Sequence, residues 1–222
     1  MRFGAVGDLH GDFEALERVM ARHPEVDFWL CPGDLANENG AYPEPRAPLY
    51  WIKGNNENFD FVAAQPLGGG TVPNLHYIPN GISVQVHGLN IAGLGGTFAP
   101  TWYAKPAAEL GQVSRNDDKR RHFVHEEVLA CAAMSGIDVF LSHEAARPFL
   151  LGRNDALRRI DAGKTPINEV LAAMRPRVHL FGHHHIYAMA ERQRVPSIGL
   201  DMVSSSYLIF DGKTLAHDRQ ET

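Results

Sequence analysis

Five short clusters of acidic, amide and imidazole side chains stand out because each directly follows a run of apolar residues. The clusters are Asp8-Leu9-His10, Gly33-Asp34, Gly54-Asn55-Asn56-Glu57, Ser142-His143-Glu144 and Gly182-His183-His184-His185. Residues two apart in an extended segment point to the same side, so both members of Asp8-x-His10 and of His183-x-His185 can face one centre. Carboxylate and imidazole groups without a thiolate suit Mn, Fe, Co or Zn, and several such ligands can serve two ions. The spacing therefore suggests a metal site.

Each cluster taken alone also has a structural interpretation. The first could be a helix N-terminus with Asp12 as its cap, and the second and third could be ordinary turns. In the fourth, His143 could be a hydrogen-bonded histidine at a strand end. The histidine triplet lies too far inside the chain to be an expression tag and has little use in a surface turn. Ligation is favoured because coincidence would have to place such groups after successive strands five times.

The elements that must position these clusters follow from the apolar pattern. Buried strands are predicted at residues 3–6, 26–31, 49–52, 137–141 and 178–181. Helices are predicted over 12–22, over 57–64, and from Pro166 with Thr165 as the cap. Alternating strands and helices favour a largely parallel sheet, whose ligand sites lie beyond the carboxyl ends of its strands. Residues distant in the sequence can therefore meet there.

The middle of the chain follows a different pattern. Close-set apolar runs at 75–78, 82–86 and 89–93 predict an antiparallel meander. The next segment is aromatic and interrupted by proline, and 107–134 is predicted to be mostly helical, which makes 98–134 a helical insert. Further short strands are expected at 186–190, 195–200, 206–210 and 214–217.

Composition limits the class of protein. A length of 222 residues favours a single domain that spans residues 1–222. With 44% apolar and 21% charged residues, the composition excludes disorder as the main state. The net charge of −5 argues against non-specific capture of nucleic acid by a basic surface. Cys31 and Cys131 are too few for a disulfide framework, and no apolar run resembles a membrane span or a signal peptide. These features predict a cytoplasmic protein without a membrane partner.

The ordered clusters resemble the motifs of the calcineurin-like metallophosphoesterases: Asp-x-His, Gly-Asp, Gly-Asn-His-Asp/Glu, His and Gly-His-x-His. The resemblance runs from residue 8 to residue 185, with all five blocks in order. It implies an α/β fold, an αββα sandwich of two mixed β-sheets flanked by helices, with a dinuclear centre between the sheets. The implied ligands are Asp8, His10, Asp34 and His185 for one metal ion, and Asp34, Asn55, His143 and His183 for the other. Asp34 would bridge the two ions.

Such a centre predicts hydrolysis of phosphate esters. Two divalent ions would outweigh the charges of Asp8 and Asp34, so the site would attract a phosphate on an acidic protein. The ions can lower the pKa of a bridging water toward neutrality and hold phosphoryl oxygens for in-line attack. Asn55 fits because its neutral carbonyl ligates without cancelling that charge. We expect two transition-metal ions (Mn, Fe, Zn or Co), attack by a metal-bridging hydroxide, and catalytic roles for Asp34, Asn56 and His10.

Asn56 departs from the family pattern, which usually has a histidine there that is thought to protonate the leaving oxygen or stabilise the transition state. An amide can donate a hydrogen bond but cannot act as a general acid near pH 7. Some small phosphodiesterases of the family resemble this chain in lacking that histidine. We therefore expect phosphodiesters to be favoured over monoesters, with His184, Glu57 or a metal-bound water as a replacement acid.

Substrate contacts are expected from a small set of residues. The candidates are Asn56, His184, Trp102 and Tyr103, with Arg115 or Lys119 as further contacts to a phosphate. Trp102 could stack a base, or it could pack with Phe98 under the insert. The order of the later blocks also resembles RNA lariat debranching enzymes, which makes a nucleotide or an RNA phosphodiester a candidate substrate.

Two alternative functions remain open on the same fold. One is a phosphomonoesterase, acting on proteins or nucleotides, which a substrate panel separates from a diesterase. The other is a non-catalytic interaction scaffold that has lost its metals. A scaffold predicts eroded ligand positions, whereas all seven positions here carry coordinating side chains.

Overall fold

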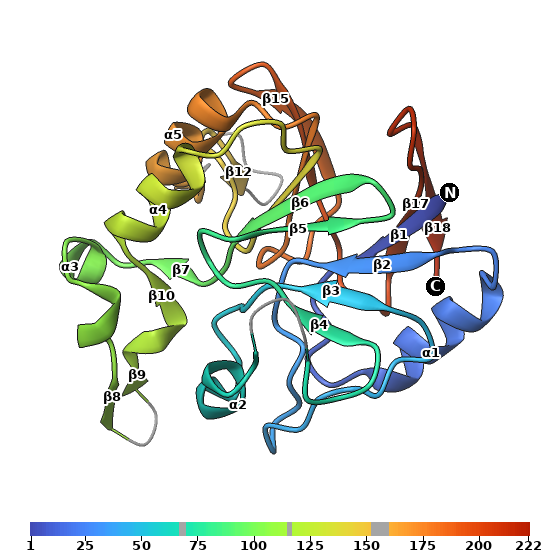
Figure 1. The fold of residues 1–222 in the computed structure, drawn as a ribbon, viewed down its shortest axis with the longest axis horizontal. Coiled ribbons are helices and arrows are strands. Elements are labelled where there is room, and N and C mark those ends of the chain that lie inside the picture. Colours follow the sequence, from blue (N-terminus) through green and yellow to red (C-terminus); the bar gives the residue numbers. More distant parts are fainter. Residues whose placement is uncertain (67–69, 115–116, 152–159) are drawn as a thin grey trace.

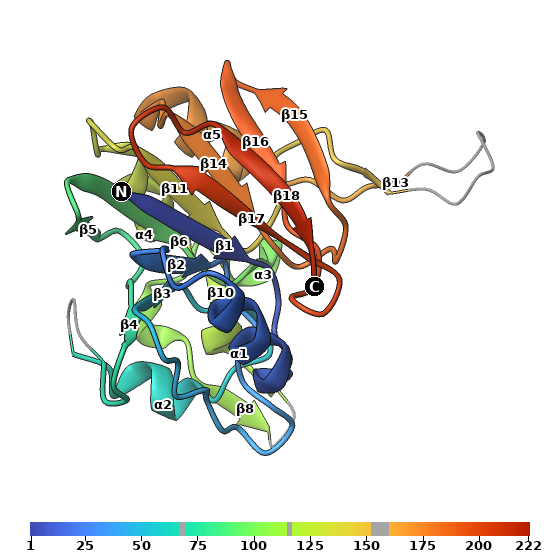
Figure 2. The same cartoon turned by 90° about the vertical axis from the view of Figure 1, so that its right-hand side faces the viewer.

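Two stacked β-sheets with helices on both outer faces form this protein (Figures 1 and 2). The computed structural model describes residues 1–66, 70–114, 117–151 and 160–222. Each of the two main sheets has six strands and mixes parallel with antiparallel pairs. This arrangement confirms the αββα sandwich that the resemblance implied.

The first sheet has the strand order β18-β17-β1-β2-β3-β4. Its strands are β1 (Arg2–Val6), β2 (Phe28–Cys31), β3 (Leu49–Trp51), β4 (Leu75–Tyr77), β17 (Ser206–Asp211) and β18 (His217–Glu221). Strands β1 to β4 run parallel, β17 pairs with β1 in antiparallel fashion, and β18 pairs with β17 in the same way. The carboxyl ends of β1, β2 and β3 therefore lie side by side.

The second sheet has the strand order β15-β16-β14-β11-β6-β5. Its strands are β5 (Ser83–Val86), β6 (Leu89–Leu94), β11 (Val139–Ser142), β14 (Val178–Phe181), β15 (Ala188–Arg192) and β16 (Val195–Gly199). Strands β6, β11, β14 and β16 run parallel, whereas the edge strands β5 and β15 are antiparallel to their neighbours. The carboxyl ends of β11 and β14 are thus neighbours as well.

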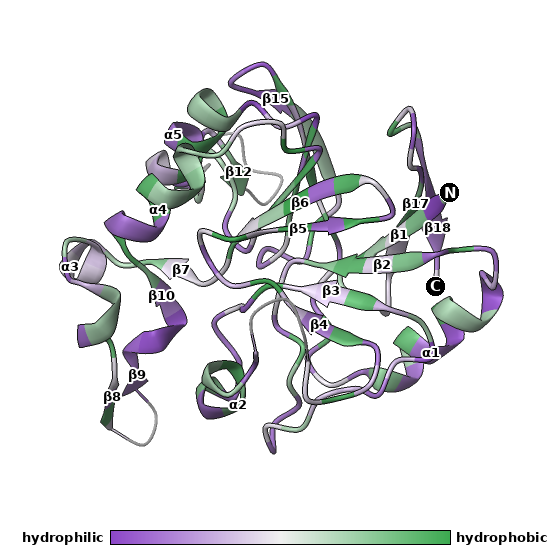
Figure 3. Cartoon of the chain, viewed as in Figure 1, coloured by the Kyte–Doolittle hydropathy of each residue, from purple (hydrophilic) through white to green (hydrophobic). Residues whose placement is uncertain are grey.

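Apolar side chains fill the space between the sheets and the space under the helices. Phe3 of β1 and Leu141 of β11 belong to the cluster between the sheets, whereas Phe140 faces the opposite way, toward the helices. The outer face of the first sheet is covered by α1 (Phe13–Arg22), and that of the second by α4 (His125–Ala132) and α5 (Thr165–Met174). The central strands β1, β2 and β6 are largely hydrophobic in Figure 3, whereas the edge strand β18 is hydrophilic.

The observed helix caps agree in part with those predicted from the sequence. The Asp12 carboxylate accepts the Ala15 N–H at 3.0 Å and caps α1, as expected. Thr165, expected as a cap, is instead the first residue of α5 and follows Lys164 at the cap position. A short helix, α2 (Phe59–Ala63), follows the third polar cluster. None of the helices in the described parts of the chain is long and apolar enough to cross a membrane.

The predicted antiparallel meander is wrong for its first strand. β4 pairs in parallel with β3 in the first sheet, and only β5 and β6 form an antiparallel pair, in the second sheet. The turn at residues 79–81 carries the chain from one sheet to the other. The sequence of a short turn does not indicate whether the next strand joins the same sheet or the other one.

The segment predicted as a helical insert contains less helix than expected. Its elements before α4 are β7 (Thr97–Phe98), α3 (Pro100–Tyr103), β8 (Gln112–Ser114), β9 (Asp117–Asp118), β10 (His122–Phe123) and the 3-10 helices η1 (Ala107–Glu109) and η2 (Lys119–Arg121). Pro106 and Gly111 interrupt any long helix, and the run around η2 is hydrophilic (Figure 3). Parallel pairing of β7 with β10 closes the base of the insert. An unpredicted hairpin joins β12 (Leu150–Leu151) and β13 (Ile160–Asp161).

His179 of β14 is a fully buried histidine held by two hydroxyl groups. Its Nε2 lies 2.7 Å from Ser142 Oγ, and its Nδ1 lies 2.6 Å from Ser197 Oγ. Because Ser142 Oγ donates its hydrogen to Glu144 O, it accepts from Nε2–H, and Ser197 donates to Nδ1. Burial lowers the pKa of His179 to about 3, so the ring is neutral in the folded protein.

We expect His179 to make folding less favourable in acid. The ring takes up a proton near its ordinary pKa of 6.5 in the unfolded chain but only near pH 3 when folded, so stability falls as pH falls through this window. At pH 5 the loss is about 2 kcal/mol of unfolding free energy. Urea denaturation between pH 5 and pH 7 should show a smaller pH dependence in His179→Asn. The control His87→Asn, in the exposed turn after β5, should keep the wild-type dependence of unfolding free energy on pH. If His179→Asn also keeps it, the neutral state of buried His179 is contradicted.

Candidate metal centre

The five polar clusters meet between the two sheets, at the carboxyl ends of parallel strands. Three follow β1, β2 and β3 of the first sheet, and two follow β11 and β14 of the second. Within the described ranges, two groups of side chains have ligand atoms that lie within 4.8 Å of one another. The groups are Asp8, His10 and His185, and Asp34, His143 and His183. The structure thus contains two candidate metal-binding groups, and the role of each residue as a ligand stays a prediction.

The first group is built around the buried carboxylate of Asp8. His185 Nε2 lies 3.0 Å from Asp8 Oδ2 and 3.0 Å from His10 Nε2. Two imidazole nitrogens at this distance share a proton or direct both lone pairs at a common cation. The His183 N–H donates to Asp8 Oδ2 at 3.0 Å and orients the carboxylate. The hydrogen bond with Asp8 raises the pKa of His185, which is a sign of a site that attracts positive charge.

The second group is built around the fully buried ring of His143. Its Nδ1 lies 2.8 Å from Pro32 O, so Nδ1 carries the hydrogen and donates it. Nε2 then faces two oxygen acceptors, Asn55 Oδ1 at 3.0 Å and Asp34 Oδ2 at 3.6 Å. Burial lowers the pKa of His143, but the charges of Asp34 and Asp8 raise it more, and the net change is upward. A proton or a metal ion is therefore favoured at this nitrogen.

Asp34 belongs to the second group and also approaches the first. Its Oδ2 is 3.6 Å from His143 Nε2 in one group and 3.7 Å from His10 Nε2 in the other. Asn56 donates its backbone N–H to Oδ1 and its side-chain amide to Oδ2, each at 2.8 Å. Burial raises the pKa of Asp34, but His143 and the Asn56 donors lower it more, so the carboxylate stays ionised. This is the placement that a bridging ligand needs.

Unusual backbone conformations bring these side chains together. Positive φ angles, from 46° to 69°, occur at His10, Asp34, His183 and His185. Such conformations are uncommon outside glycine and cluster at functional sites. The glycines of the clusters permit close approach: a Cβ on Gly54 would lie 2.0 Å from Asp34 Oδ1, and one on Gly182 would lie 2.3 Å from Asp8 Oδ1. Any side chain at either position would displace a candidate ligand.

Glu57, considered above as a replacement acid, joins the loops that follow β2 and β3. Its carboxylate accepts the N–H groups of Leu35, Ala36 and Gly54 at 3.1, 3.3 and 3.2 Å, and the hydroxyl of Tyr42 at 2.8 Å. Burial, and to a lesser extent the charge of Asp34, raises the pKa of Glu57 to about 7. Because both oxygens already accept hydrogen bonds, the geometry makes Glu57 a positioning residue.

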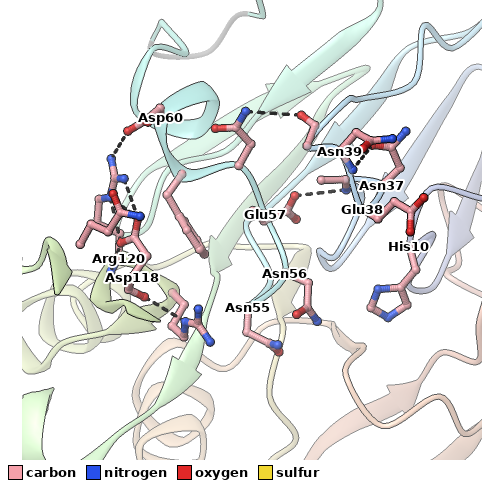
Figure 4. A pocket seen from close by; sticks show the side chains of 16 residues that line it. His10, Asn37, Glu38, Asn39, Asn55, Asn56, Glu57, Asp60, Asp118 and Arg120 are labelled. Atoms are coloured by element: carbon pink, nitrogen blue, oxygen red, sulfur yellow. Dashed lines mark hydrogen bonds and ion pairs between the residues drawn. The ribbon is translucent and has the colours of Figure 1, made fainter. Parts of the chain in front are cut away.

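A cavity of about 840 Å³ opens over the centre (Figure 4). Its lining includes His10, Asn55, Asn56, the turn at residues 36–40, and Gln112, Asp118, Arg120 and Arg121 of the insert. Sequence reasoning missed the turn and the two arginines. The basic run at 119–121 was the one available signal, and only Lys119 of that run was predicted to contact a phosphate.

Three residues expected to contact substrate lie elsewhere. Tyr103 packs against Phe98 inside the insert, Trp102 lies under the Lys119 ammonium, and His184 packs against Phe149. None of the three expected residues is among the described residues that line the cavity. Burial lowers the pKa of His184 to about 4, so its ring is neutral at pH 7. Arg115 lies outside the described residues.

Comparison with known proteins agrees with this geometry. Residues 1–187 match the family model of the calcineurin-like phosphoesterases. The chain belongs to this family. The Thermus thermophilus protein TT1561 shares the fold, with a TM-score of 0.67, 13% identity, and coverage of 99% of this chain and 98% of that chain. The resemblance seen in the motifs is thereby confirmed.

Relatives by sequence include lariat debranching enzymes. The Schizosaccharomyces pombe enzyme is 29% identical over 200 residues, which cover 80% of this chain and 42% of the relative. The Entamoeba histolytica enzyme is 23% identical, with 89% of this chain and 68% of the relative covered. The chain thus spans less than half the length of the first relative. Family and relatives together support a phosphoester hydrolase.

We expect Glu57→Ala to loosen the candidate centre. The substitution leaves three backbone N–H groups without their acceptor, and one such buried group costs about 1–3 kcal/mol. Unfolding free energy in urea should fall by at least about 2 kcal/mol, and the metal retained after dialysis against Mn²⁺ should decrease. Glu44→Ala removes an exposed carboxylate and serves as the control. Wild-type stability and metal content in Glu57→Ala would refute the positioning role.

Proposed function

We propose that this chain is a metal-dependent phosphodiesterase that uses two divalent transition-metal ions and acts on RNA diesters. The observation that supports this most is the ionised carboxylate of Asp34, buried between imidazoles of both candidate groups. One ion would be held by Asp8, His10, Asp34 and His185, and the other by Asp34, Asn55, His143 and His183. Manganese as the metal and a cytoplasmic location stay predictions.

The donor set and the charge of the cavity both fit bound cations. Imidazole nitrogens with carboxylate and amide oxygens suit divalent transition metals. Among the described lining residues, the carboxyl groups of Glu38, Glu57, Asp60 and Asp118 outnumber the guanidinium groups of Arg120 and Arg121. The cavity by itself would therefore repel a phosphate ester. When bound, the ions supply Lewis-acid chemistry, because they polarise phosphoryl oxygens and lower the pKa of the attacking water.

The protein's own contribution is to hold the donors in place before any ion binds. The Pro32 carbonyl fixes the tautomer of His143, and the His183 N–H orients Asp8. The amide and N–H of Asn56 do the same for Asp34. Such partners orient metal ligands and tune their affinity. The site is preorganised, which favours precise placement of a reacting phosphate.

Asn56 supports diesters over monoesters as substrates. It lines the cavity and is exposed, and its amide can donate a hydrogen bond to a substrate oxygen. It cannot deliver a proton near pH 7, so the proton for a leaving alkoxide must come from another group; in lacking the usual histidine, the chain resembles the small phosphodiesterases of the family. An RNA diester is supported by the lariat debranching enzymes among the relatives.

Asp34→Asn should release metal and abolish diester hydrolysis. Loss of the shared carboxylate would remove a ligand from both ions. Removing even a hydrogen-bond partner of a metal ligand typically lowers metal affinity or activity by roughly 10- to 100-fold. We expect a loss greater than roughly 100-fold in turnover of bis(p-nitrophenyl) phosphate, with metal content measured by mass spectrometry falling in parallel. Asp218→Asn, an exposed position on β18, should match the wild type. Retained metal and turnover in Asp34→Asn would refute the dinuclear assignment.

Asn56→His should shift selectivity toward monoesters. The imidazole can protonate a leaving oxygen, an effect typically worth roughly 10²–10⁴ in rate. Because p-nitrophenolate leaves without a proton whereas an alkoxide needs one, the ratio of β-glycerophosphate to bis(p-nitrophenyl) phosphate turnover should rise by roughly 100-fold. Gln85→His adds a histidine at an exposed position of β5 and controls for the new side chain. Equal ratios in Asn56→His and wild type would show that Asn56 does not determine selectivity.

A further inference from the structure

The turn at residues 36–40 forms a wall of the cavity that the metal groups do not use. In Figure 4, Glu38 lies beside His10, and Asn55 and Asn56 lie between this turn and Arg120 of the insert. No residue of the turn belongs to either candidate metal group among the described residues. The side chains of this wall are therefore placed to meet the substrate.

The turn is rigid and is packed against the candidate centre. Asn37 Oδ1 accepts the N–H groups of Asn39 and Ala41 at 3.0 and 2.9 Å, and the Asn37 N–H donates to Ala41 O at 3.0 Å. Gly11, next to His10, approaches so closely that a Cβ there would lie 2.4 Å from Asn37 Cβ. The backbone that carries Glu38 is therefore preorganised.

Glu38 presents an exposed carboxylate to the cavity. It forms no hydrogen bond or ion pair with any residue in the parts of the chain that the structure describes. A carboxylate repels a phosphate, so its partner on the substrate must be a hydrogen-bond donor. Ribose hydroxyls are such donors, and acidic residues bind the 2′-hydroxyl in dinucleotide sites. Deoxyribose lacks that hydroxyl.

The remaining lining favours recognition through hydrogen bonds over stacking. Phe59 is the one Phe, Tyr or Trp side chain among the described lining residues, and it is buried. Amide groups are frequent instead, at Asn37, Asn39, Asn55, Asn56, Asn58 and Gln112. A sugar next to the reacting phosphate would therefore meet polar groups, with Glu38 the charged acceptor beside His10.

We propose that Glu38 binds the 2′-hydroxyl of the nucleotide whose diester lies over Asp34 and Asn56, and thereby selects RNA over DNA. The inference rests on the proposed phosphodiesterase function and names the residue that sets its substrate class. Glu38 contacts the sugar and not the reacting atoms, so its effect is confined to substrates that carry a ribose.

The test compares three substrates on the full chain loaded with Mn²⁺. They are an RNA oligonucleotide, DNA of the same sequence, and bis(p-nitrophenyl) phosphate, which has no sugar. The wild type should have a higher kcat/KM for RNA than for DNA. In Glu38→Ala the RNA-to-DNA ratio should fall by roughly 10- to 100-fold, the effect of losing a hydrogen bond to a charged group. Turnover of the sugar-free diester should not fall, because that substrate has no hydroxyl for Glu38 to bind.

Two variants control for charge and for surface position. Glu38→Gln keeps one acceptor oxygen and should lose less of the RNA preference than Glu38→Ala. Glu44→Ala, an exposed glutamate outside the described cavity lining, should match the wild type. An unchanged RNA-to-DNA ratio in Glu38→Ala would overturn the inference while the diesterase function stands. An equal loss on all three substrates would also overturn it, because that would show a structural role for the turn.

A binding measurement separates this inference from the proposed function. If the wild type hydrolyses none of the three substrates, the phosphodiesterase proposal fails. Fluorescence anisotropy with labelled RNA and DNA oligonucleotides then tests Glu38 directly. A binding preference for RNA that is lost in Glu38→Ala supports the inference, and equal binding of both oligonucleotides by the wild type overturns it.

Discussion

Burial of the Asp34 carboxylate between two β-sheets is the constraint on which the site depends. A carboxylate removed from water must be matched by hydrogen-bond donors or by positive charge. Asn56 supplies two donors, and the imidazoles of His10 and His143 approach within 3.7 and 3.6 Å. These imidazoles follow strands of different sheets. The need for donors and positive charge around Asp34 therefore brings the ends of both sheets to one centre.

The fold meets this requirement because the parallel strands of each sheet end at the same edge. Loops that turn sharply after those strands place the side chains, with positive φ at His10, Asp34, His183 and His185. Gly54 and Gly182 leave room for the carboxylates. The turn at residues 36–40 and the insert then add the walls of the cavity. The residues proposed to bind metal and the residue proposed to select the substrate thus lie in separate parts of the chain.

The convergence of the polar clusters could be predicted from the sequence because each is local and directly follows a buried strand. The two interpretations of the first cluster are compatible: Asp12 caps α1, while Asp8 and His10 lie in a candidate metal-binding group. The sheet of β4 could not be predicted, because turn residues do not record which sheet comes next. Glu38 and Arg120 form no motif, and only the folded chain places them in one cavity with Asn55 and Asn56.

The most direct test of the central claim is a crystal structure of the protein grown with Mn²⁺, with anomalous diffraction measured at the manganese edge. The account predicts two anomalous peaks on either side of the Asp34 carboxylate, roughly 3.5–4 Å apart, one beside Asp8, His10 and His185 and one beside Asn55, His143 and His183. A single peak, or peaks that Asp34 does not contact, would contradict it.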